Sequence, residues 1–448
     1  MWQDLKKFGL EYCDLPTMIW NVAFLMRVLT VNIDNRYKKG IPIYFYIFTL
    51  VVTASFIYVF LVSMAWFVFY RSVGTNDLVP AMVVLSLGIS GNIGTLKLVY
   101  MLLHIDKIRE LASEYIDCDS NKTLGRRFSL NLLKTLKKVK KRAIVYWLVL
   151  VLNGAVYLIK PPFLSGSRLY RHVKRDCSVY INIKDSRKVF LPGLEPTFES
   201  PNYELTYLLV SFGIFFICYV PASVSAYLIV IAGYTEAQML AMSEEVLHLW
   251  SDAVAQVNCE DYYKNTNIKR DMLKTSNNAK PKEATKIAIE DNSYAINEII
   301  KERMKDIIKR HTVILSLYVK LEDIFRGAIA MGFILLVLGL TSELLGGLEN
   351  TYVQMPFALM QVTMDCFVGQ RVMDASVAFE RAVYECKWEN FDTGNMRMVL
   401  VMLQTAQKTL TLSAGGVSTL SFNCLMAVLR AIYSAYTALR SVMRTATI

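Results

Sequence analysis

The feature that most constrains the fold is a run of 29 residues without a charge, residues 41–69, in a chain of 448 residues. A helix needs about 20 consecutive apolar residues to cross a bilayer core, and an uncharged helix of this length is highly unusual in a soluble protein. The run therefore predicts a membrane-spanning helix. Composition agrees, because 54% of the residues are hydrophobic and only 19% are charged, against roughly 25% charged in soluble proteins.

Six further apolar stretches have lengths typical of membrane spans. The seven candidate spans are 41–69, 78–103, 143–159, 206–235, 324–341, 352–373 and 419–442. The first, third and fourth contain no charge, and the last has the weakest apolar character. We therefore predict an all-α membrane protein with seven transmembrane helices.

The distribution of Lys and Arg predicts the orientation, because these residues accumulate in short cytoplasmic loops. Most of the 49 Lys and Arg residues lie in segments 1–40, 104–142, 236–323 and 374–418, although segment 160–205 is basic as well. We expect a cytoplasmic N-terminus and an extracellular C-terminus. The net charge of +11 then reflects cytoplasmic segments, chiefly 104–142, and not a nucleic-acid-binding surface.

This topology divides the chain into six parts. They are a cytoplasmic segment 1–40, four spans with an outer loop 160–205 in 41–235, cytoplasmic helical extensions with a flexible linker in 236–323, two spans in 324–373, cytoplasmic anchor helices in 374–418, and a last span with a short outer tail in 419–448. Helical spacing of apolar residues continues past the fourth and fifth spans. We therefore expect a cytosolic helical anchor domain, with the Asn- and Lys-rich segment 261–292 as its flexible linker.

The sequence gives no support for an enzyme. It contains no phosphate-binding or hydrolase motif, and the four His and eight Cys residues show no metal-ligand spacing. The glycine-rich run 88–94 lies inside an apolar span, where small residues favour close helix packing. We expect no enzymatic activity, no cofactor and no metal.

The last span carries the most informative pattern. Small or polar residues recur every three or four positions and so share one helix face: Asn423, Ala427, Arg430, Ser434, Thr437 and Ser441. Lipid would disfavour such a stripe, so it must face protein or water. It either packs within the chain or lines a pore built from several subunits. Arg430 would be unfavourable in a homomeric cation pore, where it would repeat in every subunit. It is tolerable in a mixed assembly, or if its side chain extends toward the inner face.

Three C-terminal motifs identify a family. They are Val377-Ala-Phe-Glu-Arg-Ala-Val-Tyr384 followed by Trp388, then Leu410-Thr-Leu-Ser-Ala-Gly-Gly-Val-Ser-Thr-Leu-Ser421, then Val428-Leu-Arg-Ala-Ile-Tyr-Ser434 with Tyr436-Thr-Ala-Leu-Arg440. In combination they resemble insect odorant receptors of the ligand-tuning type, and the rest of the chain agrees in span number, topology and loop sizes. The Thr-Tyr and Gln-Phe signature of gustatory receptors is absent, and the inner loop and glycine break differ from those of the odorant co-receptor.

The resemblance implies an odorant-sensing subunit of a heteromeric, ligand-gated, nonselective cation channel. Its implied partners are odorant co-receptor subunits in a tetramer, a small volatile organic ligand, the lipid bilayer and permeating cations, with no nucleic acid; its implied location is the plasma membrane of sensory-neuron dendrites. Implied pore-lining residues are Arg430, Ser434, Thr437, Ala438, Ser441 and Val442. Implied subunit-anchor residues are Tyr384, Trp388, Gly415 and Gly416. Small residues stand at the outer gate where a hydrophobic plug is expected, so partner subunits would have to close the pore.

The resemblance also places the ligand in the outer half of the helix bundle, among spans two to six. The corresponding candidates are Met82, Leu85, Ser86, Tyr157, Phe212, Phe216, Tyr352, Met355 and Phe357. Aromatic and Met side chains form adaptable apolar cavities, although ordinary packing would use the same residues. The outer halves of these spans, 333–340 and 352–361 among them, contain no charged residue, which favours a volatile apolar ligand over an amine.

Two questions stay open at this level. Lys97 and Asp365 lie near the inner ends of the second and sixth spans, where they either form an ion pair or reach the interface separately. The alternative functions are a G-protein-coupled chemoreceptor, a gustatory-type receptor channel and a secondary transporter. The chain lacks the Asp-Arg-Tyr and Asn-Pro-x-x-Tyr motifs of rhodopsin-like receptors, and it shows no internal repeat of the transporter kind.

Overall fold

The computed structural model describes residues 7–34, 36, 40–72, 78–120, 125–163, 202–259, 281–347, 351–352 and 354–446. Most of the predicted outer loop 160–205 and of the predicted linker 261–292 lies outside these residues, and so does the side chain of Tyr157.

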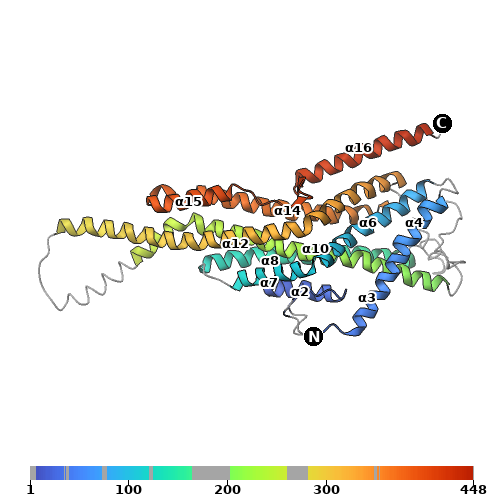
Figure 1. Cartoon of the computed structure of the whole chain (residues 1–448), viewed down its shortest axis with the longest axis horizontal. Coiled ribbons are helices and arrows are strands. Elements are labelled where there is room, and N and C mark those ends of the chain that lie inside the picture. Colours follow the sequence, from blue (N-terminus) through green and yellow to red (C-terminus); the bar gives the residue numbers. More distant parts are fainter. Residues whose placement is uncertain are drawn as a thin grey trace.

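The described chain is helical almost throughout. Its elements are α2 (Leu15–Arg27), α3 (Ile43–Phe56), the π-helical η1 (Ile57–Ser63), α4 (Met64–Trp66), the π-helical η2 (Phe67–Arg71), α6 (Leu78–Leu103), α7 (Ile105–Ser120), α8 (Arg126–Phe163), α10 (Asn202–Leu247), α12 (Pro281–Gly346), α14 (Gln354–Tyr384), the 3₁₀ turn η4 (Trp388–Asn390), α15 (Thr393–Ala406), β1 (Ser413–Ala414), β2 (Ser418–Thr419) and α16 (Phe422–Ala446). Figure 1 shows the helices running mostly along one long axis. This is an all-α membrane fold.

The segments that cross the membrane differ in the length of their apolar stretches. Within the described ranges, five helical segments are long and apolar enough by themselves: Ile43–Arg71, Val79–Leu103, Glu204–Leu247, Asn292–Gly346 and Phe422–Val442. The remaining two of the seven are α8 and α14. Their apolar stretches are short or interrupted, because α8 begins with a basic segment and α14 carries Gln361 and Asp365.

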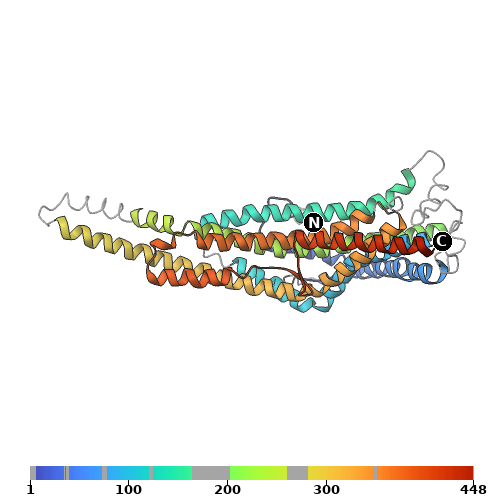
Figure 2. The same ribbon diagram turned by 90° about the horizontal axis from the view of Figure 1, so that it is seen from above.

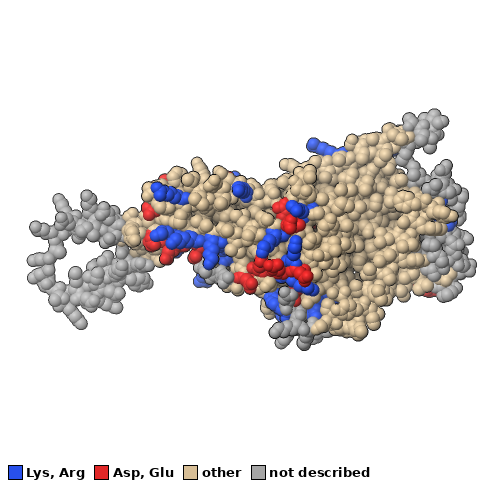
Figure 3. Space-filling view, viewed as in Figure 1, with Lys and Arg blue, Asp and Glu red and all other residues tan. Residues whose placement is uncertain are grey.

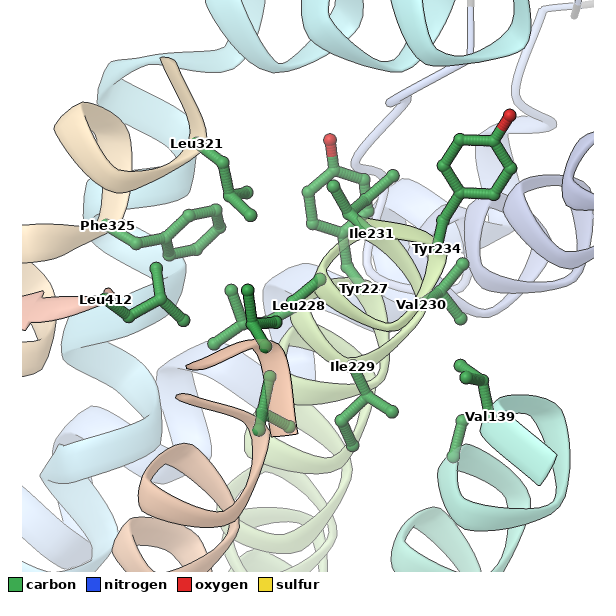
Figure 4. Packing of buried hydrophobic residues seen from close by; sticks show 14 of the residues in the cluster. Val139, Tyr227, Leu228, Ile229, Val230, Ile231, Tyr234, Leu321, Phe325 and Leu412 are labelled. Atoms are coloured by element: carbon green, nitrogen blue, oxygen red, sulfur yellow. The ribbon is translucent and has the colours of Figure 1, made fainter. Parts of the chain in front are cut away.

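Helix α10 forms the centre of the bundle. In its most apolar window 94% of the residues are buried, because α10 is apolar on every side and a helix of that kind must be surrounded. Figure 4 shows the side chains from Tyr227 to Tyr234 pointing in several directions, toward Leu321, Phe325 and Leu412 and toward Val139. Glycines allow the closest approaches: a Cβ on Gly94 would lie 2.4 Å from Pro221 Cβ.

Charged side chains hold the inner ends of the helices together. Arg127 of α8 pairs with Glu245 of α10 at 3.1 Å and also with Asp252. Arg303 of α12 reaches Asp252 at 3.3 Å. Figure 3 shows the same division on one face of the surface, with charges gathered beside α15 and the inner part of α12 and an almost uncharged surface over the outer half. Such a division fits a membrane-embedded half and an aqueous half.

Helix α16 stands away from the bundle, with the C-terminal end of the chain at its tip (Figures 1 and 2). The segment before it is an antiparallel hairpin in which Ser413 pairs with Thr419. Gly415 and Gly416 take positive φ angles of 64° and 78°, which glycine adopts without strain. Gly415 N donates to Arg326 O at 3.0 Å. Residues 413–416 therefore form an ordered turn, fixed to α12.

Candidate ligand cavity and pore helix

A small cavity lies where the outer parts of five elements meet. Its lining comes from η1, α6, α8, α10 and α14: Phe60, Leu87, Ser90, Gly91, Asn153, Ile214, Ile217, Cys218, Gln354 and Phe357. The volume is about 20 Å³, which is close to the space of one water molecule. An organic molecule would therefore have to displace side chains such as Phe60 and Ile217 to occupy it.

Polar side chains from three helices converge beside this cavity. Ser90 Oγ donates to Glu343 Oε1 at 3.0 Å. Gln354 Nε2 donates to Ser86 Oγ at 2.6 Å, and Gln361 Nε2 donates to Ser90 O at 3.5 Å. The cavity is thus mostly apolar with a few fixed polar groups on one side, which is the usual character of a small-molecule site.

Glu343 corrects the expectation that the outer half holds no charged residue. The segment considered in the sequence ended at residue 340, but α12 continues to Gly346 and buries Glu343 completely. Side chains on a helix lean toward its N-terminus, so the carboxyl group reaches back into the bundle as far as Ser90. The outer half of the bundle therefore does not disfavour an amine ligand.

The sequence-predicted ligand residues occupy different places around this region. Phe357 lines the cavity, and Ser86 contacts its lining through Gln354. Phe216 is buried but stacks on Phe56 with ring centroids 4.6 Å apart. Met82, Leu85, Phe212 and Met355 are half-buried, and Tyr352 is exposed.

The lining from α10 was missed because the residues were selected by type. Phe212 and Phe216 share one helix face, while Ile214, Ile217 and Cys218 on another face line the cavity. Since α10 is apolar all round, no periodicity in the sequence distinguishes these faces. The small and polar members of the α6 lining, Ser90 and Gly91, lie in the glycine-rich run 88–94 and could have been found there.

Two larger hollows lie nearer to the inner end. One, of about 480 Å³ between α7 and α12, is lined by charged side chains such as Glu114, Lys309 and Arg310, which suit an apolar volatile poorly. The other, of about 370 Å³, is lined mainly by apolar residues of α2, α8 and α10. Its position beside the basic inner part of α8 places it toward the cytoplasmic side in the predicted orientation.

Lys97 and Asp365 form an ion pair between α6 and α14. Lys97 Nζ lies 2.5 Å from Asp365 Oδ2, and both side chains are almost fully buried. Two charges in an apolar bundle are tolerated when they satisfy one another. The structure therefore supports the paired arrangement over two side chains that reach the interface separately.

The predicted pore residues all lie on the outside of the subunit. Arg430, Ser434, Thr437, Ala438, Ser441 and Val442 are exposed, as are Asn423 and Ala427 of the same stripe. The face of α16 toward α12 and α14 is instead apolar, with Leu425, Val428, Leu429 and Ile432 packed against the core. Packing within the chain therefore does not explain the stripe.

The predicted anchor residues lie in two places: Tyr384 and Trp388 lie between α14 and α15, near Asn297 of α12, and Gly415 and Gly416 lie in the hairpin, near Arg326 of α12. Tyr384 and Trp388 are 65% and 40% exposed, and Val417 at the hairpin tip is 93% exposed. Cys386 between the two aromatic residues is buried, and burial raises the pKa of its thiol to about 11. Exposed aromatic and apolar side chains at both places are available for contacts with other subunits.

Comparison with known proteins agrees with this architecture. The 7tm odorant receptor family matches residues 77–433. Odorant receptor 22c of Drosophila melanogaster is 25% identical over 126 residues, which are 26% of this chain and 31% of that receptor. Odorant receptor 13a of the same fly is 26% identical over 173 residues, which are 34% of this chain and 41% of that receptor. The similarity thus spans less than half of either relative's length.

Among solved structures, the olfactory receptor OR5 of the insect Machilis hrabei has a similar fold. Its complex with eugenol aligns with a TM-score of 0.67 at 12% identity, over 96% of this chain and 98% of the other. A second structure of the same receptor aligns with a TM-score of 0.66 at 11% identity over the same shares of both chains. With a family match that covers most of its length, this chain belongs to the 7tm odorant receptor family.

Proposed function

We propose that this chain is the odorant-sensing subunit of a heteromeric, ligand-gated, nonselective cation channel. A small volatile compound binds in the outer half of the bundle, and α16 lines the pore. Its partners are odorant co-receptor subunits in a tetramer, and its location is the plasma membrane of sensory-neuron dendrites. The single observation that carries the proposal is the exposed polar stripe of α16.

That stripe favours a pore for an energetic reason. A row of polar residues facing lipid is costly, and the cost disappears when the row faces water or another subunit. Thr437 Oγ1 donates to Ser434 O at 2.9 Å and Ser441 Oγ to Ala438 O at 2.8 Å. The hydroxyl protons are thus used within the helix, and the oxygen atoms present lone pairs outward, which suits cations.

Helix α14 offers a mechanical link between ligand and pore. Phe357 at the cavity and Gly369 belong to the same continuous helix, about 18 Å apart along its axis. A Cβ on Gly369 would lie 2.5 Å from Leu420 O, just before α16. Phe367 lies near Phe422, with ring centroids 6.3 Å apart. Movement of α14 when the cavity expands would therefore shift the base of α16.

In the proposed channel, the subunits contact one another through the anchor and through α16. Leu400 and Val401 of α15 are 67% and 56% exposed, on the same inner part of the chain as Tyr384 and Trp388. Burying apolar surface of this kind between subunits is favourable, at about 25 cal/mol per Å². The anchor would hold the subunits together while the pore helices stay free to move.

The proposal is tested by expressing the chain with and without an odorant co-receptor and recording whole-cell currents during application of a panel of volatile compounds. We expect a nonselective cation current that needs the co-receptor and persists when G proteins are blocked with GDPβS. Nucleotide exchange on a G protein without such a current would support the G-protein-coupled alternative instead.

A further inference from the structure

The buried carboxyl group of Glu343 is only half satisfied. Glu343 Oε1 accepts from Ser90 Oγ, but Glu343 Oε2 is buried and has no hydrogen-bond partner among the described residues. Gln361 Oε1 is also buried and without a partner among the described residues, while the amide nitrogen of Gln361 donates to Ser90 O. Buried polar atoms normally find partners, so these two acceptors could each take a hydrogen bond from a molecule bound beside them.

Several oxygen acceptors near the cavity lack a donor, and one of them belongs to the lining: Asn153 Oδ1 is buried and has no hydrogen-bond partner among the described residues. The Ser90 hydroxyl proton is directed to Glu343, so Ser90 Oγ has only lone pairs for the cavity that it lines. Gln354 Nε2 is likewise directed to Ser86 Oγ. A molecule in the cavity therefore meets hydrogen-bond acceptors, and it gains most if it brings a donor.

Close packing of α12 on α6 fixes this arrangement. A Cβ on Gly346 would lie 2.7 Å from Val83 Cγ2, and a Cβ on Gly339 would lie 3.3 Å from Ser90 Oγ. These two glycines bracket Glu343 on α12. They bring the carboxyl group to a fixed depth beside Ser90, so the acceptors are held in place before a ligand arrives.

We propose that the cavity selects volatile compounds that carry a hydroxyl or amino group, which donates to Ser90 Oγ and Glu343 Oε2. The inference rests on the proposed odorant-binding function and names the ligand class. An amine can in addition form a charge-assisted hydrogen bond with the Glu343 carboxyl group. Ethers, esters and hydrocarbons of the same size leave the acceptors unpaired and bind more weakly.

Three probes of equal heavy-atom count test the proposal: 1-octanol, 1-aminooctane and the ether 1-methoxyheptane have nearly the same size and differ in the donor. Binding is measured by thermal stabilisation of the purified full-length protein in detergent. We expect the alcohol and the amine to half-saturate at concentrations on the order of tenfold lower than the ether. Ser90→Ala should remove most of the alcohol preference and Glu343→Gln most of the amine preference.

Ser342→Ala is the matched control. Ser342 is the buried neighbour of Glu343 on α12, and its hydroxyl donates to Leu338 O within its own helix at 2.8 Å. This variant should keep both preferences. Equal affinity of the wild-type protein for all three probes, or unchanged preferences in both Ser90→Ala and Glu343→Gln, would overturn the proposal. The wild-type comparison alone decides if a variant fails to fold.

The same probes separate this inference from the proposed function. Donor-selective binding without any current in the co-expression experiment would leave the ligand class standing and refute the channel. Currents that respond equally to alcohol and ether would support the channel and refute the ligand class.

Discussion

Helices α10 and α16 both cross the membrane, yet they relate to the rest of the subunit in opposite ways. In their most apolar windows, 94% of α10 is buried and only 6% of α16. Within the subunit, α10 is surrounded by α8, α14, α3 and α6. Helix α16 packs on the subunit through one apolar face only, and its polar stripe stays exposed.

The difference in burial indicates that α16, and not α10, contacts groups outside the subunit. A polar stripe on an exposed membrane helix is stable only against water or another protein surface. The central helix therefore belongs to the stability of the single subunit, and the last helix belongs to the assembly. Substitutions in α10 should therefore affect the stability of the subunit, and substitutions in α16 should affect the assembly.

Matched tyrosines give the largest expected contrast. Tyr227 of α10 is fully buried and Tyr433 of α16 is 67% exposed. Tyr227→Ala should lower the free energy of unfolding of the isolated subunit by about 3–5 kcal/mol, because it opens a cavity in the core. Tyr433→Ala should change it by less than about 0.5 kcal/mol. Denaturation of the purified subunits in detergent measures both, and equal losses would break the comparison.

The buried ion pair tests whether the tight core extends to α6 and α14. Lys97→Met leaves the Asp365 carboxylate buried without its partner, and we expect a cost of about 3 kcal/mol or more. The exchanged pair Lys97→Asp with Asp365→Lys should recover part of this loss. Cell-surface expression and thermal unfolding are the measurements. Failure of the exchange to recover either would count against a direct pairing.

Two helical glycines sharpen the picture of how closely α10 is packed. Gly94→Ala places a Cβ 2.4 Å from the rigid ring of Pro221, and the strain should cost about 1–3 kcal/mol. Gly332→Ala is the control, because its Cβ meets only an ordinary contact at 3.7 Å and should gain up to about 1 kcal/mol of helix stability. A stable Gly94→Ala protein would show that α6 and α10 pack more loosely than described.

Cysteine reactivity gives the smallest effect and concerns the anchor. Cys386 is buried and its pKa is raised to about 11, so at pH 8 it is almost wholly protonated and shielded. Its alkylation should be slow and should accelerate as the pH approaches 11, since the thiolate is the reactive form. Cys259 is exposed and should be labelled first. Mass spectrometry of alkylated peptides at several pH values measures both, and rapid labelling of Cys386 at pH 8 would contradict a packed anchor.

Several of these features could be predicted from the sequence because they depend on composition or simple periodicity. The uncharged runs predicted the membrane helices, and the spacing of Arg430 and Ser434 predicted the polar stripe. The ion pair was one of the two arrangements that the sequence left open for Lys97 and Asp365. Each of these signals lies within one helix, or joins two charges that have few alternatives in an apolar bundle.

The cavity could not be predicted in the same way. Its α10 lining lies on a helix without a distinguishable face, and Ile214 and Cys218 look like any other core residues. Glu343 was missed because α12 continues beyond its apolar stretch, and only the packing on α6 shows that the carboxyl group is buried. The turn at Gly415 and Gly416 needed the contact with Arg326 O to be distinguished from a flexible break. All three depend on contacts between distant segments.

In the proposed channel, the polar stripe of α16 lines a water-filled pore. This arrangement is tested most directly by comparing two adjacent positions, the exposed Ser434 and the half-buried Ala435, each changed to cysteine and co-expressed with the co-receptor. We predict that a charged methanethiosulfonate reagent blocks most of the ligand-evoked current in Ser434→Cys and leaves Ala435→Cys and the unmodified chain nearly unaffected. Equal block at both positions, or no block at Ser434→Cys, would contradict a pore lined by this face.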